Sequence, residues 1–281
     1  MPDFPELPVV AGATSADAAR SRVRTDYARV AQASDAGDCC GEASSCCGVS
    51  EDEQINRLLS LRLGYTDADL AAVPAGADMG LGCGNPRAIA SLQPGETVLD
   101  LGAGGGFDCF LAAAEVGPEG HVIGVDMTPD MLSKARGNAA RGGFGNVELR
   151  LGEIEHLPVA DGTVDVIISN CVINLSPNKP QVFREAFRVL KPGGRLAIAD
   201  VVASAELPAE MRDDPHLHSA CVAGASLIGE LDAMLTAAGF VDVAIAPKDA
   251  SKDFIRDWAP GRGVEDYVVS AIIEGRKPSG L

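Results

Sequence analysis

The feature that most constrains the fold is a regular alternation of short apolar runs and amphipathic stretches from residue 96 onward. Buried strands are predicted at TVLDL, HVIGVD, VELRL, VDVIIS and GRLAIADV, with helices such as FDCFLAAAEV and KPQVFREAFRVL between them. Strands that alternate with helices form a parallel sheet covered on both faces. Two later runs, VDVAIA and EDYVVSAIIEGRK, complete seven strands. We therefore predict a doubly wound, mostly parallel α/β domain over residues 75–281.

Residues 1–74 differ in character and are expected to form an N-terminal extension. The first 13 residues contain three prolines and predict an arm without regular structure. A helix is predicted from Thr14, which forms a capping box with Asp17, because Val23, Tyr27 and Val30 recur at helical spacing. The small polar segment DCCGEASSCCGVS predicts a loop, and DEQINRLLSLRLGY predicts a second helix.

Charge and composition exclude several classes of protein. The chain has 281 residues, a net charge of −17 and only 4% aromatic residues, which argues against a nucleic-acid partner. No apolar run reaches the roughly 20 residues of a membrane span. The start, MPDFPELPVV, lacks the basic and apolar parts of a signal peptide. We therefore expect a cytoplasmic protein whose thiols are kept reduced.

The segment VLDLGAGGGFD places a glycine turn between the first strand and the first helix of the domain. Ligands of doubly wound sheets bind at the carboxyl ends of the strands, where glycines let the backbone approach closely. Gly102 and Gly104 fit the dinucleotide pattern, but Phe107 at its third position argues against NAD. Asp126 lies about 20 residues further on, where an acid binds ribose hydroxyls. A nucleoside-type cofactor is favoured over a plain turn beside an exposed acid.

The glycine turn also resembles a known motif. The string Asp100-x-Gly102-x-Gly104-x-Gly106 is similar to the first motif of class I S-adenosylmethionine methyltransferases, which have a Rossmann-like fold. The resemblance implies that this turn binds S-adenosylmethionine, with Asp126 on the ribose.

Three neighbouring segments agree with this resemblance. Met127 follows the ribose acid and is placed to pack on the adenine. GEIEHLP resembles the adenine-edge segment of the family, which puts Glu153 and Ile154 at the ring, and LKPGGRLAIAD resembles its fifth strand. For Met127 and Ile154, the alternative is an ordinary core position.

The methyl acceptor must be a nucleophile, and O- or N-methylation usually needs a general base. Of the four histidines, only His216 and His218 in DDPHLHSACVAGA are free to act as one. The alternative is that both are solvated loop residues.

Eight cysteines offer another kind of acceptor site. An even count is compatible with disulfides, but a long chain with ample apolar residues and no sign of secretion favours ligand thiols. Cys171 ends the fourth strand, Cys221 follows the fifth, and Cys83 precedes the first, so all three can meet at the carboxyl edge. Convergent thiolates bind soft centres such as trivalent arsenic. Arsenic held by three thiols keeps a lone pair that can attack a sulfonium methyl without a base.

Three motifs, GCGNP, SNCVINLSP and CVAGA, together resemble arsenite S-adenosylmethionine methyltransferases. The likeness runs from about residue 20 to the C-terminus and includes VRTDYARVA. It implies that Cys83, Cys171 and Cys221 bind arsenic, the last of them in a C-terminal insertion, and that Asn170 faces the cofactor. HLHSACVAGA departs from the family because it lacks the aromatic residue that often precedes the last cysteine. The number of methyl groups transferred is therefore left open.

The remaining cysteines have other expected roles. Cys109 lies on the apolar face of a helix and is expected in the core. Two pairs, Cys39–Cys40 and Cys46–Cys47, do not match zinc spacing, and no histidine lies nearby. They form either a solvated loop or an additional clamp for arsenic.

The leading hypothesis is thus an enzyme of arsenic detoxification that methylates arsenite and methylarsenite with S-adenosylmethionine. It would use glutathione or thioredoxin as the external thiol reductant. One alternative is a small-molecule methyltransferase of the quinone or sterol type, which needs no convergent thiols. The other is a thiol-rich metal- or metalloid-binding protein, for which an intact glycine turn and Asp126 have no use.

Overall fold

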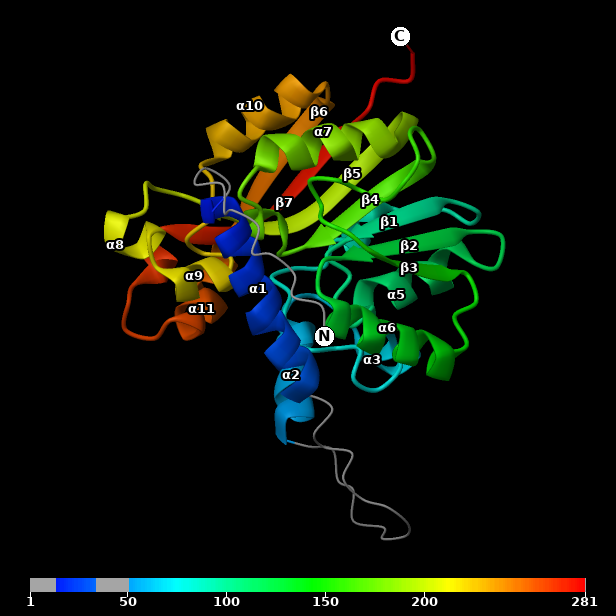
Figure 1. Cartoon of the computed structure of the whole chain (residues 1–281), viewed down its shortest axis with the longest axis horizontal. Helices are drawn as coiled ribbons and strands as arrows, with labels where there is room; N and C mark the ends of the chain where they lie inside the picture. The colour runs from blue at the N-terminus through cyan, green and yellow to red at the C-terminus, as the bar shows by residue number, and fades with distance from the viewer. Residues whose placement is uncertain (1–13, 34–50, 281) are drawn as a thin grey trace, which may run out of the picture.

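The computed structural model describes residues 14–33 and 51–280. Its centre is a seven-stranded sheet in the order β3-β2-β1-β4-β5-β7-β6 (Figure 1). Strands β1 to β5 pair in parallel, and β7 is antiparallel to both β5 and β6. The predicted mostly parallel, seven-stranded sheet is confirmed. The strands are β1 (Thr97–Leu101), β2 (His121–Asp126), β3 (Val147–Leu151), β4 (Val164–Asn170), β5 (Leu190–Ala203), β6 (Val241–Lys248) and β7 (Val268–Arg276).

Helices cover both faces of the sheet, as the alternation predicts. Helices α7 (Lys179–Val189) and α10 (Ile228–Ala238) lie together over one face (Figure 1). The other face packs against α4 (Arg87–Ala90), α5 (Phe107–Val116) and α6 (Pro129–Gly142). Each apolar side chain that these contacts bury fully contributes about 1.5–3 kcal/mol.

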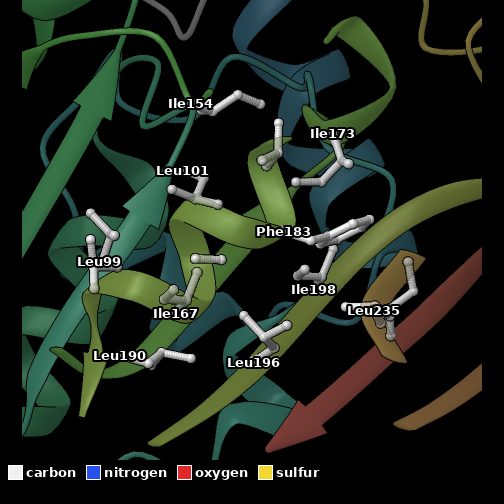
Figure 2. Close-up of a cluster of buried hydrophobic side chains, with 14 of the residues drawn as sticks. Leu99, Leu101, Ile154, Ile167, Ile173, Phe183, Leu190, Leu196, Ile198 and Leu235 are labelled. Carbon is white, nitrogen blue, oxygen red and sulfur yellow. The ribbon is translucent and has the colours of Figure 1, made fainter. Parts of the chain in front are cut away.

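Figure 2 shows the larger core cluster, under α7 and α10. Leu99, Ile167 and Leu196 come from three adjacent strands, and Phe183 and Leu235 pack on them from the two helices. These contacts hold β1 and β4 side by side at the point where the strand order reverses. Ligands of doubly wound sheets bind beside such a switch point.

Most of the remaining helices lie near the carboxyl ends of the strands, whereas Asp69 of α3 pairs with Arg87 at the start of α4. Helix α1, in blue in Figure 1, crosses this edge and packs against both α6 and α9. The second predicted helix ends at Arg62, shortly before Gly64, which has a φ of 98°. These helices are α1 (Thr14–Ala33), α2 (Glu51–Arg62), α3 (Asp67–Ala72), α8 (Ala209–Arg212), α9 (Pro215–Ser219) and α11 (Lys252–Ile255).

Candidate active site

The glycine turn between β1 and α5 is tight on one side and open on the other. Gly102 has a φ of 73°, and a Cβ atom there would lie 2.5 Å from Val172. Gly106 has a φ of 92°, and its Cβ would lie 2.5 Å from Phe110. At Gly104, no described atom lies within 4 Å of such a position. A ligand can therefore approach the backbone at Gly104.

Asp126, at the end of β2, is fixed to this turn by backbone hydrogen bonds. Its Oδ2 accepts from the Gly104 N–H at 2.9 Å, and its Oδ1 accepts from the Thr128 N–H at 2.8 Å. Burial raises the pKa of Asp126, and these bonds oppose that rise. The predicted ribose acid is thus held rigidly beside the open side of the turn.

A pocket that is partly open to solvent lies above the turn. Helix α1 contributes Arg20, Val23 and Tyr27 to its wall. Gly106, packed against Phe110, is not part of that wall. The predicted cofactor residues that do line it are Asp100, Gly102, Gly104, Asp126, Met127, Ile154 and Asn170.

The predicted adenine segment is divided between the pocket and helix α1. Ile154 lines the pocket and also belongs to the core cluster in Figure 2. Glu153 is not part of the wall, because its carboxylate pairs with Arg20 at 3.3 Å and with Arg24 at 3.4 Å. Arg20 also contacts Glu155 at 3.3 Å, and only 14% of its side chain is exposed. The two glutamates hold α1 against the pocket.

Carboxylates gather in the pocket wall. Burial raises the pKa of Asp100 well above its ordinary value, and the nearby charge of Asp108 adds to the rise. Burial also raises the pKa of Asp108, while its hydrogen bond from Tyr65 lowers it. The buried thiol of Cys109 donates to Asp100 at 3.1 Å, so this cysteine lies in the core as predicted. A wall rich in carboxylates suits a cationic ligand.

Asn170, the last residue of β4, ties three segments together. Its Nδ2 donates to the Tyr65 hydroxyl at 3.1 Å and to Asp108 at 3.2 Å. The same nitrogen donates to the carbonyl of Gly84 at 2.9 Å, and its Oδ1 accepts from the Cys83 N–H at 3.0 Å. One side chain therefore both lines the pocket and holds the segment that carries Cys83.

The three thiols named from the sequence meet at this edge of the sheet. Cys83, Cys171 and Cys221 share one apolar cluster and are 2%, 7% and 2% exposed. The sulfur atoms of Cys83 and Cys171 and a carboxylate oxygen of Asp200 lie within 4.8 Å of one another. The Cys221 thiol donates to the carbonyl of Cys171 at 2.8 Å and also interacts with the Cys171 thiol. Three distant segments thus form one thiol cluster, defined as Cys83, Cys171 and Cys221.

Two of these cysteines have an uncommon backbone conformation. Cys171 has a φ of 57° and Cys221 a φ of 60°, in the left-handed region that favours glycine. Among the described residues, the other two non-glycine residues with positive φ are Ser91 and Asp242. A conformation of this kind persists where the surrounding structure enforces it, and it is common at functional sites.

The surroundings of the thiols favour the protonated form. Burial raises the pKa of Cys83. For Cys171, the hydrogen bond with Cys221 lowers the pKa, but the one with Cys83 and burial together raise it well above its ordinary value. The hydrogen bond with Cys171 and burial raise the pKa of Cys221. The cluster is apolar and has Asp200 beside it, so the free thiols are protonated at neutral pH.

Comparison with known proteins identifies the family. Residues 92–239 match a family of methyltransferase domains. Over 92% of this chain and 67% of the relative, the sequence is 55% identical to an arsenite methyltransferase from Halobacterium salinarum. The chain belongs to the arsenite methyltransferase family. A second relative in this family, from Aquipseudomonas alcaligenes, is 46% identical over 57% of this chain and 48% of its own length.

A solved structure from the arsenite methyltransferase family has the same fold. The arsenic(III) S-adenosylmethionine methyltransferase of Chlamydomonas reinhardtii is 34% identical, with a TM-score of 0.58 over 78% of this chain and 73% of that one. The chain spans about half to two thirds of the length of the two arsenite methyltransferases that it matches in sequence. None of the described helices is long and apolar enough to cross a membrane.

In this arsenite methyltransferase family member, Cys221 depends on residues whose roles the sequence did not suggest. Asn174 Nδ2 donates to Asp200 at 3.0 Å and to the carbonyl of Cys221 at 3.3 Å. A Cβ atom on Gly224 would lie 2.0 Å from the carbonyl oxygen of Asn174. The buried Lys179 donates to the carbonyl of Gly224 and, at 2.6 Å, to the Ser226 hydroxyl. These contacts fix the CVAGA segment against β5.

Two tyrosines in the pocket wall were also missed. The chain has three tyrosines, and Tyr27 and Tyr65 both line the pocket. Tyr27 donates to the carbonyl of Ser219 at 3.3 Å, which joins α1 to the end of α9 next to Cys221. The sequence offered one signal for them. Aromatic residues make up only 4% of the chain, so each tyrosine was a candidate for a specific role.

The other candidates from the sequence lie elsewhere. His218 is half-buried, its Nε2 is 3.3 Å from the carbonyl of Leu175, and burial lowers its pKa. His216 lies in α9 and is exposed. The four N-terminal cysteines, Cys39, Cys40, Cys46 and Cys47, lie outside the described residues.

Proposed function

We propose that the protein transfers a methyl group from S-adenosylmethionine to trivalent arsenic held by Cys83, Cys171 and Cys221. The observation that carries the proposal is the meeting of three buried thiols, from three distant segments, beside the pocket of the glycine turn. The names of the relatives support arsenite as the acceptor. Methylarsenite is the acceptor that we propose for a second round.

The residues of the pocket fit S-adenosylmethionine. The open side of Gly104 leaves room for the ligand at the backbone, and Asp126 is fixed where ribose hydroxyls are bound. Met127 and Ile154 offer an apolar surface for the adenine, and the carboxylates of Asp100 and Asp108 match a positive charge. When bound, the cofactor supplies an electrophilic methyl group on a sulfonium.

The thiols capture arsenic without a separate base. Each protonated thiol exchanges with one hydroxyl of arsenous acid, which forms an As–S bond and releases water. Three such bonds leave a lone pair on arsenic, and this pair forms the As–C bond as the methyl leaves the sulfonium. Arsenic is thereby oxidised from the trivalent to the pentavalent state. An external thiol reductant, glutathione or thioredoxin, then returns two electrons.

Three further predictions complete the proposal. The protein would serve arsenic detoxification in the cytoplasm. Residues 75–281 would form the methyltransferase domain, with residues 1–74 as an extension. The N-terminal cysteines would act in the delivery of arsenic rather than in its methylation.

The test is to incubate the protein with S-adenosylmethionine, glutathione and arsenite, and then to separate the arsenic species. Methylated arsenicals are expected only when cofactor and thiol are both present, and Cys171→Ser should abolish them because a hydroxyl is a poor arsenic ligand. Turnover of a quinone precursor without any arsenic product would favour the alternative small-molecule methyltransferase.

A further inference from the structure

A buried carboxylate lies beside the thiol cluster, and the proposed methylation does not use it. Asp200, in β5, is 1% exposed. One of its oxygens lies within 4.8 Å of the sulfur atoms of both Cys83 and Cys171. In the part of the chain that the structure describes, this is the one group of three buried metal-ligating side chains so close together. Cys221 is not a member of this group.

The carboxylate is rigidly held. Its Oδ1 accepts from Asn174 Nδ2 at 3.0 Å and from the Val201 N–H at 2.7 Å. Its Oδ2 accepts from the Ile173 N–H at 2.9 Å. The backbone N–H of Asn174 also interacts with this carboxylate. These bonds fix the carboxylate beside the sulfur atoms of Cys83 and Cys171.

The charge at this position calls for a cation. Two thiolates and a carboxylate would carry three negative charges in a buried site, where charges must be paired or bind a metal. The charge of Lys179 acts on Asp200. Its Nζ, however, donates to the carbonyl of Gly224 and to the Ser226 hydroxyl. The side of Asp200 that faces the sulfur atoms is therefore left for another cation.

Two sulfur ligands and one carboxylate oxygen suit a different ion from arsenic. Zinc binds tetrahedrally to cysteine sulfur and to aspartate oxygen, and thiolates also select for thiophilic divalent ions in general. Trivalent arsenic instead takes three sulfur ligands and keeps its lone pair. The two ligand sets share Cys83 and Cys171 and differ in the third member, which is Asp200 for the divalent ion and Cys221 for arsenic.

We propose that Cys83, Cys171 and Asp200 form a binding site for a thiophilic divalent cation of the zinc class, which competes with trivalent arsenic for the two shared thiols. The occupied site would close the acceptor position and inhibit methylation. The binding site goes beyond the proposed function and does not depend on it, because the ligand set is defined by geometry alone. Its effect on methylation rests on the proposed function.

The test measures the binding of zinc alone, without cofactor or turnover. The experiment uses the full chain with Cys39, Cys40, Cys46 and Cys47 replaced by serine. These four thiols could bind zinc themselves and would obscure binding at the proposed site. Competition with a chromogenic chelator should give one zinc ion per chain. Asp200→Asn should weaken zinc binding about 10-fold or more, as the loss of a metal ligand does. Asp214→Asn, at a partly buried carboxylate that caps α9, is the control and should leave zinc binding unchanged.

Two results would overturn the inference. The first is an unchanged zinc affinity in a folded Asp200→Asn chain, with folding checked by circular dichroism. If that variant does not fold, anomalous diffraction identifies the zinc ligands directly in the zinc-loaded chain that keeps Asp200. A zinc ion beyond bonding distance of Asp200 would also overturn the inference. A lack of arsenic methylation would count against the proposed function and leave these measurements unaffected.

Discussion

The side-chain oxygen of Asn170 accepts a hydrogen bond from the backbone N–H of Cys83 at 3.0 Å. The two residues are 87 positions apart in the chain, so the bond joins the loop before β1 to the end of β4. Cys171 follows Asn170 directly. One amide therefore governs how far the Cys83 thiol lies from the Cys171 thiol.

Removal of this amide should act on methylation through Cys83. We expect Asn170→Ala to lower kcat/KM for arsenite about 10-fold or more, since buried partners left unpaired cost about 1–3 kcal/mol. In a Cys83→Ser chain, the same change should cost distinctly less, because the thiol that it positions is already gone. A double-mutant cycle on arsenite methylation measures this coupling. Equal losses in both backgrounds would show that Asn170 acts on the cofactor alone.

The thiols should divide by role when the two acceptors are compared. Methylarsenite has one valence taken by carbon and can bind only two protein thiols. The Cys83 thiol also interacts with the Cys171 thiol, but Cys83 lies on a loop before the sheet. Cys171 directly follows β4, and the Cys221 thiol donates to its carbonyl. Cys83→Ser should therefore spare methylarsenite methylation more than arsenite methylation, while Cys171→Ser and Cys221→Ser should stop both.

Single Cys→Ser chains assayed with arsenite and with methylarsenite check this division. Cys109→Ser is the control, because a serine hydroxyl can still donate to Asp100. Wild-type rates with both acceptors in Cys171→Ser would contradict the mechanism.

The sheet could be predicted because local patterns determine it. Strands β1, β2 and β3 and helix α5 have the predicted bounds, since each is an apolar run between strong turn residues. Strand β5 is longer than predicted, from Leu190 to Ala203, because it pairs with β4 at Leu190 and with β7 as far as Ala203. Short helices such as α3 and α9 carry too few residues for a periodic signal.

The site could be predicted only in part. The residues that support the cysteines and the pocket come from distant segments, and only the fold brings them together. Glycine spacing indicated the turn, and motif context brought the three cysteines together. Nothing local to Asp200 shows that it lies beside two thiols, since β5 reads as an ordinary buried strand there. Glu153 illustrates the same limit, because its pairing with Arg20 depends on where α1 packs.

The arginines of α1 should differ in their effect on cofactor binding. Arg20 lines the pocket and bridges Glu153 and Glu155, whereas Arg24 makes one contact and 41% of its side chain is exposed. We expect Arg20→Met to raise the Kd for S-adenosylmethionine about 10-fold, because buried Glu155 loses its ion-pair partner and keeps only the hydrogen bond from Ser176. Arg24→Met should change it less than about 3-fold, since exposed pairs contribute little. Calorimetry on both chains tests this, and equal effects would show that α1 acts only through its overall packing.

Asp126 should be needed for cofactor affinity. Asp126→Ala removes the proposed ribose acid and leaves the Gly104 and Thr128 N–H groups without their acceptor. The expected cost in binding S-adenosylmethionine is about 1–3 kcal/mol. Asp130→Ala is a suitable control, because Asp130 is only partly buried and pairs with Gln32 at the surface. Unchanged affinity in Asp126→Ala would refute the ribose assignment.

Asp200 should make the stability of the protein depend on pH. Burial raises its pKa from 3.8 to about 6, so the folded state holds this proton more tightly than the unfolded state. The contribution to stability is fully present below pH 3.8 and is lost as the pH rises through 6. The loss is on the order of 3 kcal/mol.

In Asp200→Asn, residue 200 has no proton that titrates. The free energy of unfolding of this variant should therefore fall less than that of the wild type as the pH rises. Urea unfolding of both chains between about pH 4 and pH 7 measures the difference, because the other carboxyl groups titrate equally in each and cancel. Asp214→Asn is an informative control, because the hydrogen bond from Arg262 lowers the pKa of Asp214 and the trend should have the opposite sign. A difference between wild type and Asp200→Asn that stays constant over this range would mean that Asp200 binds its proton equally in the folded and unfolded states. Burial would then not raise the pKa of Asp200.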